Sequence, residues 1–578
     1  FKPSGSFGYT VEKERGRFRV FAPRAKKVEL ILYKKKDESE TERLSMIREE
    51  DGSWVQYVQR EWEGNYYNYA IIKECSSLKS RHFEKKILDP YAKATNGRDG
   101  VGIILPPEVE DNSNHFFSPP PMSELIILET HLRDLLAKAP IELTHNERLE
   151  FNGLTKWLSS SDCYLRKIGV NAVELQPIQE FDARTKEEYH WGYMPVNYFS
   201  PESSYASDPH SGVAIQEFKA LVKAFHSAGI SVILDVVYNH VGIPLHLFNL
   251  DRELYFRIDE HGRLENNSGC GNDLNCESEP TRKLILDSLE YLVKVFDIDG
   301  FRFDLGELLG ADFLELIEDR MAGVKKNLAL IAEPWSFRGR LPNSIGSTGF
   351  ALWDDGCREE VLKFVKGEGN ENVILQLLKG EMNESTYPWQ AVNYIESHDD
   401  FTFVDRLCDM NEFPRGNIPV EVARKSILGL SILLLSPGIP MISAGQDLLR
   451  NKKGYRNTYQ RGDLNEIHYK TLNEDAEYSR QIRKLIEFRR SKKGSVLRPN
   501  TMGENTYEEW NGSPEGVIGL FVEKQSEGNK VMIIINANSW EVDLILPPNW
   551  SAARCVIAGE ICPKSMNPYE CKLLERMN

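Results

Sequence analysis

The sequence predicts an α/β protein in which a closed (β/α)8 barrel, a TIM barrel, lies between two β-sandwich domains. Three observations support this fold class. The chain has 578 residues, more than one hydrophobic core usually organises. Its middle part alternates short apolar runs with amphipathic stretches of helical length, eight times over. Both ends instead show the two-residue periodicity of half-buried strands, so we expect β domains there.

The first β-sandwich is predicted to span residues 1–110. Four of its segments alternate polar and apolar positions and are bounded by turn residues: 16–23, 26–35, 53–58 and 65–72. Aromatic residues are frequent in these segments, for example Phe18, Trp54 and Tyr67. We expect most of these rings to fill the core between two sheets.

The barrel is predicted over residues 111–495. Its eight apolar runs lie at 125–129, 170–175, 231–237, 299–305, 328–334, 348–353, 391–397 and 439–445. Helical stretches such as 217–229 and 281–296 separate them. Apolar strands that alternate with helices indicate a parallel sheet covered on both faces. Eight such units are the number found in a closed barrel.

The last domain, residues 496–578, is predicted as a second β-sandwich, because strand periodicity returns at 516–524, 530–537 and 542–547. Just before it, the most apolar run of the chain covers residues 427–439. Gly429, Ser431 and Pro437 interrupt this run. It therefore predicts a buried helix leading into a strand rather than a membrane span.

The composition disfavours several classes of function. The net charge is −16, from 71 Lys and Arg against 87 Asp and Glu, so nucleic acid is not an expected partner. No targeting segment is visible, although the chain does not begin with Met, and we expect a cytoplasmic protein with no membrane partner. The nine cysteines show no zinc spacing and are expected to be reduced thiols. The sequence requires no cofactor and leaves the oligomeric state open.

Charged residues gather at the ends of the predicted barrel strands, where TIM barrels carry their chemistry. These residues are Asp235, with His240 shortly after it, then Arg302, Asp304, Glu333, His398 and Asp399. A single carboxylate in such a place is often only a helix N-cap. Four carboxylates from four strands, together with two histidines and an arginine, indicate a shared site instead.

This residue set suits the cleavage of an acetal. That reaction needs one carboxyl group held protonated to release the leaving oxygen, and one ionised carboxylate to attack or stabilise the reacting carbon. Arg302 precedes Asp304 by two residues on one strand, so both side chains point to the same side and the guanidinium favours an ionised Asp304. Glu333 precedes Pro334 and Trp335, a stiff apolar setting that favours a protonated carboxyl group.

Four segments carry a resemblance to a known family. DVVYNHVG (235–242), GFRFDL (300–305), AEPW (332–335) and ESHDD (396–400) resemble, in the same order, the four signature regions of the alpha-amylase superfamily. Position by position, the resemblance implies that Asp304 is the nucleophile, Glu333 the acid/base and Asp399 the transition-state stabiliser. It further implies that Asp235 supports Arg302, and that His240 and His398 bind the reacting sugar.

Other segments resemble the debranching members of that superfamily. Residues 190–209 are similar to the pullulanase and isoamylase segment in which a tyrosine stacks under the reacting sugar, here Tyr193. Residues 444–469 look closest to type I pullulanases, and residues 353–367 to isoamylases and bacterial glycogen debranching enzymes. The first domain resembles the starch-binding-type module of these enzymes. The resemblance therefore implies hydrolysis of α-1,6 branch linkages in glycogen- or starch-like α-glucans, or in malto-oligosaccharide limit dextrins.

The sequence also departs from these relatives. Met194 stands where they usually have Asp or Asn, Gly306 and Glu307 replace Met or Ala after the second carboxylate, and Asp400 replaces Asn or Gly. These positions leave the choice between isoamylase and pullulanase specificity open. Trp335, beside the expected acid, is a further candidate for stacking on a glucose ring.

Two alternatives remain within this reading. One is an α-1,4-acting amylase or a glucan-branching transferase of the same superfamily, and the other is a non-catalytic glucan-binding subunit. The debranching-type segments disfavour the first, and the complete carboxylate set disfavours the second. Asn239 matches a position that binds Ca²⁺ in many amylases, but debranching enzymes often lack that ion, and we expect its amide to hydrogen-bond a loop instead.

Overall fold

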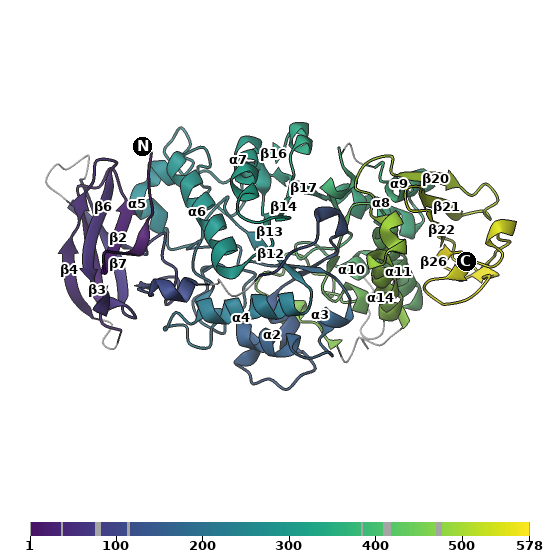
Figure 1. Cartoon of the computed structure of the whole chain (residues 1–578), viewed down its shortest axis with the longest axis horizontal. Helices are drawn as coiled ribbons and strands as arrows, with labels where there is room; N and C mark the ends of the chain where they lie inside the picture. Colours follow the sequence, from purple (N-terminus) through teal and green to yellow (C-terminus); the bar gives the residue numbers. More distant parts are fainter. Residues whose placement is uncertain are drawn as a thin grey trace.

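A computed structural model describes residues 2–35, 39–74, 82–111, 116–382, 385–408, 418–469 and 477–576. The chain forms a central barrel with an antiparallel β domain at each end, and these two domains lie on opposite sides of the barrel (Figure 1). The fold class predicted from the sequence is therefore confirmed. Within the described residues, no helix is both long enough and apolar enough to cross a bilayer.

The N-terminal domain consists of two antiparallel sheets. One contains β1 (Gly8–Glu12), β2 (Arg15–Phe21), β6 (Ser53–Gln59) and β5 (Ile47–Arg48), in that order. The other contains β4 (Glu40–Ser45), β3 (Lys27–Tyr33), β7 (Tyr66–Glu74) and β8 (His82–Ile87), with β9 (Gly102–Ile103) paired to β7. Phe18, Trp54 and Tyr67 are buried between the sheets, as the sequence predicts for core aromatics.

The barrel contains eight parallel strands, and all eight coincide with the predicted apolar runs. In chain order they are β10 (Ile127–Thr130), β11 (Ala172–Leu175), β12 (Ser231–Val236), β13 (Gly300–Phe303), β14 (Ala329–Ala332), β17 (Ala351–Asp354), β18 (Ala391–Asn393) and β19 (Ile439–Ser443). Neighbouring strands pair in this order, and β10 pairs with β19 to close the ring. Between β14 and β17, a short hairpin forms from β15 (Trp335–Ser336) and β16 (Gly339–Arg340).

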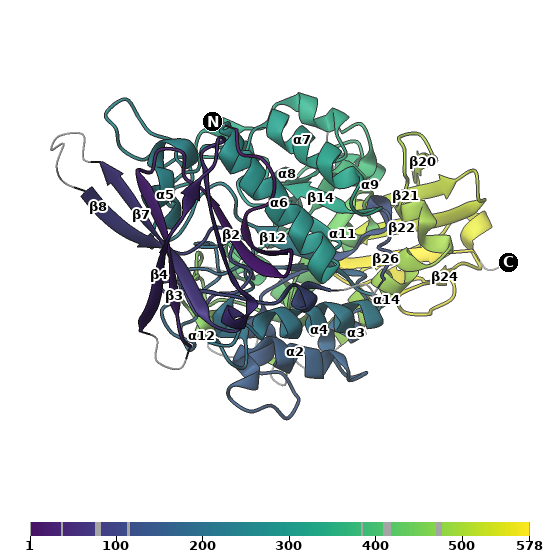
Figure 2. The ribbon, with the colours of Figure 1, turned by 60° about the vertical axis from the view of Figure 1, so that its left-hand side comes forward.

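Helices surround the barrel (Figure 2). The longer ones are α2 (Phe151–Leu158), α4 (Ala214–Ser227), α5 (His246–Tyr255), α6 (Glu279–Phe296), α7 (Ala311–Ala322), α8 (Asp355–Lys366), α9 (Glu371–Lys379), α11 (Val420–Leu435) and α14 (Glu477–Arg490). Shorter ones are α1 (Leu132–Ala137), α3 (Tyr164–Lys167), α10 (Phe403–Leu407) and α12 (Gly462–Asn465). In α4, Phe218, Leu221, Val222 and Phe225 recur at helical spacing and are fully buried.

The C-terminal domain contains a five-stranded antiparallel sheet. Its order is β20 (Asn505–Glu509), β21 (Val517–Lys524), β22 (Asn529–Asn536), β26 (Glu570–Glu575) and β24 (Arg554–Cys555). A two-stranded sheet, β23 (Val542–Asp543) with β25 (Ser565–Met566), accompanies it. The predicted domain boundary near residue 495 lies between α14 and β20, and the one near residue 110 lies between β9 and β10.

The alternation of side chains along the barrel strands determines what faces the interior. Ile127, Ala172, Ile233 and Ile331 belong to one apolar cluster inside the barrel. Because strand side chains alternate between faces, residues two positions further along point inward as well. These residues are Glu129, Glu174, Asp235 and Glu333. A layer of carboxyl groups therefore lies directly above the apolar interior, toward the C-terminal rim.

Candidate active site

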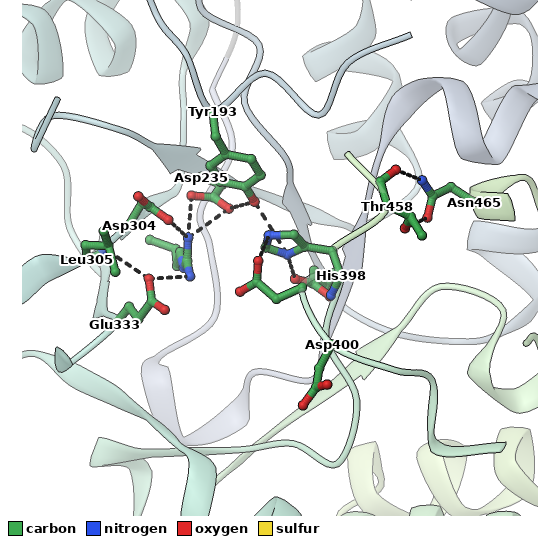
Figure 3. Close-up of polar contacts among 12 residues, drawn as sticks. Tyr193, Asp235, Asp304, Leu305, Glu333, His398, Asp400, Thr458 and Asn465 are labelled. Carbon is green, nitrogen blue, oxygen red and sulfur yellow. Dashed lines mark hydrogen bonds and ion pairs between the residues drawn. The ribbon is translucent and has the colours of Figure 1, made fainter. Parts of the chain in front are cut away.

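The buried guanidinium of Arg302 is the centre of this layer. Figure 3 labels the three carboxyl groups that it contacts, Asp235, Asp304 and Glu333. Arg302 is directly opposite Asp235 in the β12–β13 register, and its Nη1 donates to both Asp235 oxygens, at 2.9 and 3.1 Å. The same Nη1 lies 3.1 Å from Asp304 Oδ1, and Nη2 lies 3.0 Å from Glu333 Oε2. One cation thus contacts three carboxyl groups. The relation of Asp235 to Arg302 inferred from the sequence matches this geometry.

Beneath the guanidinium lies the indole of Trp353, with the Arg302 Cζ 4.2 Å from the ring centroid. Trp353 is buried at 2 % exposure, so it packs inside the barrel and is not available to stack on a ligand. A delocalised guanidinium is weakly hydrated and stacks on aromatic faces, which explains why this position accepts an arginine without direct solvent contact.

Glu333 follows β14 and is buried. Burial raises the pKa of Glu333 to about 8, and the negative charges of Asp304 and Asp399 add to this effect, while Arg302 opposes it. Glu333 Oε2 also accepts a 2.8 Å bond from the backbone N–H of Leu305. At neutral pH Glu333 is therefore largely protonated, the state that a general acid requires.

Asp304 lies at the end of β13, and its side chain is 13 % exposed. It accepts hydrogen bonds from Arg302 Nη1 and, at 3.0 Å, from the Asn239 amide, which also donates to the Asp304 carbonyl. Both side-chain donors stabilise a negative charge on this carboxyl group. Arg302 thus connects the carboxyl group of Asp304, which also accepts the Asn239 amide, to the protonated carboxyl group of Glu333.

His398 and Asp399 form the other side of the site. His398 Nδ1 lies 2.6 Å from Glu129 Oε1, and the His398 backbone N–H donates to Glu129 Oε2 at 3.0 Å. Its Nε2 lies 3.1 Å from Asp399 Oδ1. Burial lowers the pKa of His398, but Asp399 and Glu129 outweigh burial and raise it well above the usual range. His398 is therefore an imidazolium, which in turn lowers the pKa of Asp399 despite the opposing effect of burial.

Tyr193 joins the two halves of the site. Its hydroxyl donates to Asp235 Oδ2 at 2.5 Å, and its ring stacks on the His398 imidazole with centroids 4.9 Å apart and an angle of 10° between the planes. His240 Nε2 lies 2.7 Å from the Tyr193 carbonyl, and its Nδ1 contacts the Asn239 amide oxygen. Burial lowers the pKa of His240, and both of its ring nitrogens are engaged by oxygen atoms of the chain.

A cavity of about 710 Å³ opens above these groups. Its walls contain the predicted residues Tyr193, His240, Asp304, Glu333, His398 and Asp399. They also contain Asp182, His190, Trp191, Met194, Ser268, Gly269, Cys270, Leu305, Phe337, Asn457 and Tyr459. Asp235 and Arg302 are completely buried below this surface and act on it through their contacts.

Some predicted residues lie differently from expectation. Trp335 is not among the cavity-lining residues. It packs against the apolar cluster inside the barrel, with Arg340 Cζ 5.2 Å from its ring centroid. Phe337, two residues further on, instead projects into the cavity mouth at 82 % exposure. Met194 contributes an apolar wall, whereas Asp400 lies outside the wall and faces Arg358 at 3.6 Å.

Sequence reasoning missed Glu129 as a member of the site. A signal was present, because Glu129 lies at the end of the first apolar run, and Asp235 and Glu333 likewise lie near the ends of their runs. The side-chain amide of Asn239 contacts Asp304 through its nitrogen and His240 through its oxygen. Among the described residues, no group of three or more His, Cys, Asp or Glu is suited to a metal ion. Cys270 is a free thiol at the cavity wall.

Comparisons with known proteins agree with this geometry. Residues 6–92 match the family model for carbohydrate-binding module 48 (isoamylase N-terminal domain), and residues 150–257 match that for the alpha amylase catalytic domain. Isoamylase 3, chloroplastic, of Oryza sativa subsp. japonica is 30% identical over 553 residues, which cover 80% of this chain and 68% of that protein. The pullulanase of Bacillus subtilis is 29% identical, over 86% of this chain and 73% of its own length.

Among solved structures, a pullulanase from Anoxybacillus sp. complexed with maltotetraose superposes with a TM-score of 0.88 at 26% identity, covering 100% of this chain and 88% of that one. Both the catalytic barrel and the N-terminal domain thus have counterparts in these relatives. The chain belongs to the alpha-amylase family of glycoside hydrolases, in its debranching subgroup, and carries an N-terminal carbohydrate-binding module 48.

Proposed function

We propose that this protein hydrolyses α-1,6 branch linkages of glycogen- or starch-like α-glucans, or of their limit dextrins, with retention of configuration. The observation that carries the proposal is the pair formed by Asp304 and Glu333, which share one guanidinium, with two side-chain donors on Asp304 and burial that keeps a proton on Glu333. A retaining glycosidase holds its two carboxyl groups roughly 5 Å apart. Contact of both groups with the two ends of one arginine fork supports such a spacing.

In the first step, the Asp304 carboxylate attacks the anomeric carbon while the carboxylic acid of Glu333 gives its proton to the leaving glycosidic oxygen. The carbon–oxygen bond to the leaving chain breaks, and an ester between Asp304 and the sugar forms. In the second step, the Glu333 carboxylate takes a proton from water, whose oxygen replaces Asp304 at the same carbon. The resulting sugar keeps its original configuration, and both carboxyl groups return to their starting states.

The remaining groups of the cavity support this chemistry without a cofactor. Asp399, held ionised by His398, is placed to stabilise positive charge on the reacting sugar. The stacked Tyr193 ring offers an apolar face to a sugar ring, and His240 and His398 line the same cavity beside it. The similarity to pullulanases and isoamylases supports the α-1,6 linkage as the bond that is cut.

The test is a comparison of products from four glucans. The purified protein is incubated separately with glycogen, amylopectin, pullulan and linear amylose, with Asp304→Asn as the matched inactive control, and the released chains are chromatographed. We expect linear oligosaccharides from branched substrates, none from amylose and none with the variant. Cleavage of amylose would place the protein with amylases or transferases, and binding without any product would indicate a glucan-binding subunit. The pullulan result separates pullulanase from isoamylase specificity.

A further inference from the structure

The peptide segment from His398 to Asp400, which carries the third carboxylate, is held at every residue by another part of the chain. Glu129 accepts the His398 backbone N–H at 3.0 Å. On the opposite side, the Asn457 backbone N–H donates to the Asp399 carbonyl at 2.9 Å. The Lys452 ammonium donates hydrogen bonds to the carbonyls of the two residues that flank Asp399 in sequence, His398 and Asp400. Three residues, through four hydrogen bonds, thus fix the backbone from which the Asp399 side chain, 55 % exposed, projects into the cavity.

Lys452 is an unusual lysine, because it is buried at 1 % exposure. Its Nζ donates to the His398 carbonyl at 2.6 Å and to the Asp400 carbonyl at 3.2 Å. Both acceptors are neutral peptide oxygens, and in the described part of the chain Lys452 forms no direct ion pair. A buried cation is normally paired with a carboxylate, since its removal from water is otherwise expensive. Asp399 is the residue between the two peptide groups that Lys452 holds, and its charge stabilises the ammonium together with the charges of Glu396 and Asp134.

The loop that carries Lys452 follows β19 and is itself well anchored. The Lys452 backbone N–H donates to Asp405 Oδ2 at 2.9 Å. Further along, Thr458 Oγ1 donates to Asn465 Oδ1, and the Asn465 amide returns a bond to the Thr458 carbonyl, both at 2.7 Å. Figure 3 shows this second anchor on the far side of His398 from Glu333. The loop therefore offers a firm support for the ammonium rather than a mobile one.

We propose that Lys452 is a positioning residue for Asp399: by bonding the carbonyls of His398 and Asp400, it sets the peptide that aims Asp399 at the reacting sugar, and its charge favours the ionised carboxylate. Lys452 contacts no substrate in this scheme and acts only through Asp399. The inference rests on the proposed glycosidase function and adds a residue that none of the four signature segments contains.

The test is a double-mutant cycle. Lys452→Met removes the ammonium and keeps an unbranched side chain, while Lys453→Met, at the exposed neighbouring lysine, removes the same charge without touching the segment. Each is measured with the best glucan substrate and with α-maltotriosyl fluoride, whose fluoride leaves without needing a proton from Glu333. The Asp399→Asn background completes the cycle, because residues that act as one unit give non-additive effects.

We expect Lys452→Met to lower kcat at least about tenfold with KM changed less than about twofold, whereas Lys453→Met retains wild-type values. In the Asp399→Asn background, Lys452→Met is expected to have little further effect on fluoride hydrolysis. An unchanged kcat, or an equal fold-loss with and without Asp399, would overturn the inference. If Lys452→Met does not fold, Lys452→Ala, which likewise has no N–H donor on its side chain, takes its place in the same cycle with the same criteria. A wild-type protein inactive on every glucan and on the fluoride would instead overturn the proposed function, and this inference with it.

Discussion

Replacing Glu333 with glutamine is expected to abolish activity and, at neutral pH, to stabilise the folded protein. Glutamine has nearly the same shape, and its carbonyl oxygen is able to accept the bonds from Arg302 and the Leu305 backbone N–H. Glutamine cannot ionise, however. The substitution therefore removes both the general acid and the energetic consequence of burying it.

The magnitude follows from the raised pKa. Burial, aided by the charges of Asp304 and Asp399, raises the pKa of Glu333 from 4.5 to about 8. Between these values the folded protein keeps a proton that the unfolded chain releases, so the free energy of unfolding falls as pH rises. Each pKa unit corresponds to about 1.4 kcal/mol, which gives a loss of about 3 kcal/mol between about pH 5 and 7 and about 5 kcal/mol over the whole window. The free energy of unfolding of Glu333→Gln does not fall in this way, because glutamine has no proton to release over this pH range.

Two measurements check this reasoning. Denaturant unfolding of wild type and Glu333→Gln, followed by tryptophan fluorescence, is expected to show a stability gain for the variant that is larger at about pH 7 than at about pH 5. The wild-type kcat/KM for a branched glucan is expected to fall above about pH 8, as Glu333 loses its proton. A gain independent of pH, together with activity that persists unchanged well above pH 9, would refute the assignment of Glu333 as a buried, protonated acid.

Three further predictions concern the groups around this acid. Arg302→Met leaves three carboxyl groups, of which Asp235 and Glu333 are buried, without their cation. It is expected to lower the free energy of unfolding by about 3–5 kcal/mol at neutral pH, and a loss below about 1 kcal/mol in denaturant unfolding would contradict the network. Glu129→Gln removes a carboxylate that raises the pKa of His398, so NMR titration is expected to show His398 losing its proton at lower pH than in wild type. Tyr193→Phe deletes the hydrogen bond to Asp235 but keeps the stacked ring, and it is expected to lower kcat/KM about tenfold. Tyr193→Ala also removes the ring and is expected to lower kcat/KM further. Equal losses in the two variants would argue against a role for stacking.

The barrel was predictable because its strands are buried on both faces and therefore appear as apolar runs. Side chains alternate along a strand, so Glu333, two residues after the interior Ile331, points inward as well. Most of the carboxylate layer is therefore predictable from the residues at the strand ends. The solvent accessibility of single aromatic rings could not be predicted from the sequence, since it depends on the hairpin of β15 and β16. That hairpin packs Trp335 against the interior and exposes Phe337.

The contacts that Glu129 and Lys452 make with the segment around Asp399 were beyond sequence reasoning for a different reason. Each acts on the segment around Asp399 from a distant part of the chain, and their contacts exist only because β10 pairs with β19 and the following loop returns over β18. The periodicity of apolar residues within one segment contains no information about contacts between segments that meet only when the barrel closes. The charge of His398 is likewise a property of the assembled site, since it depends on two carboxylates from different segments.

The bond between Glu129 and His398 joins residues 269 positions apart, across the seam where the first and last strands meet. During synthesis the first strand is made long before its partners, and a chain that ends before His398 already contains Asp304 and Glu333. Such a fragment has the proposed nucleophile and the proposed acid but lacks both the imidazolium and the strand that closes the ring. Under the proposed function, activity requires the completed barrel, and hydrolysis of a glucan would report that the last strand has joined the first.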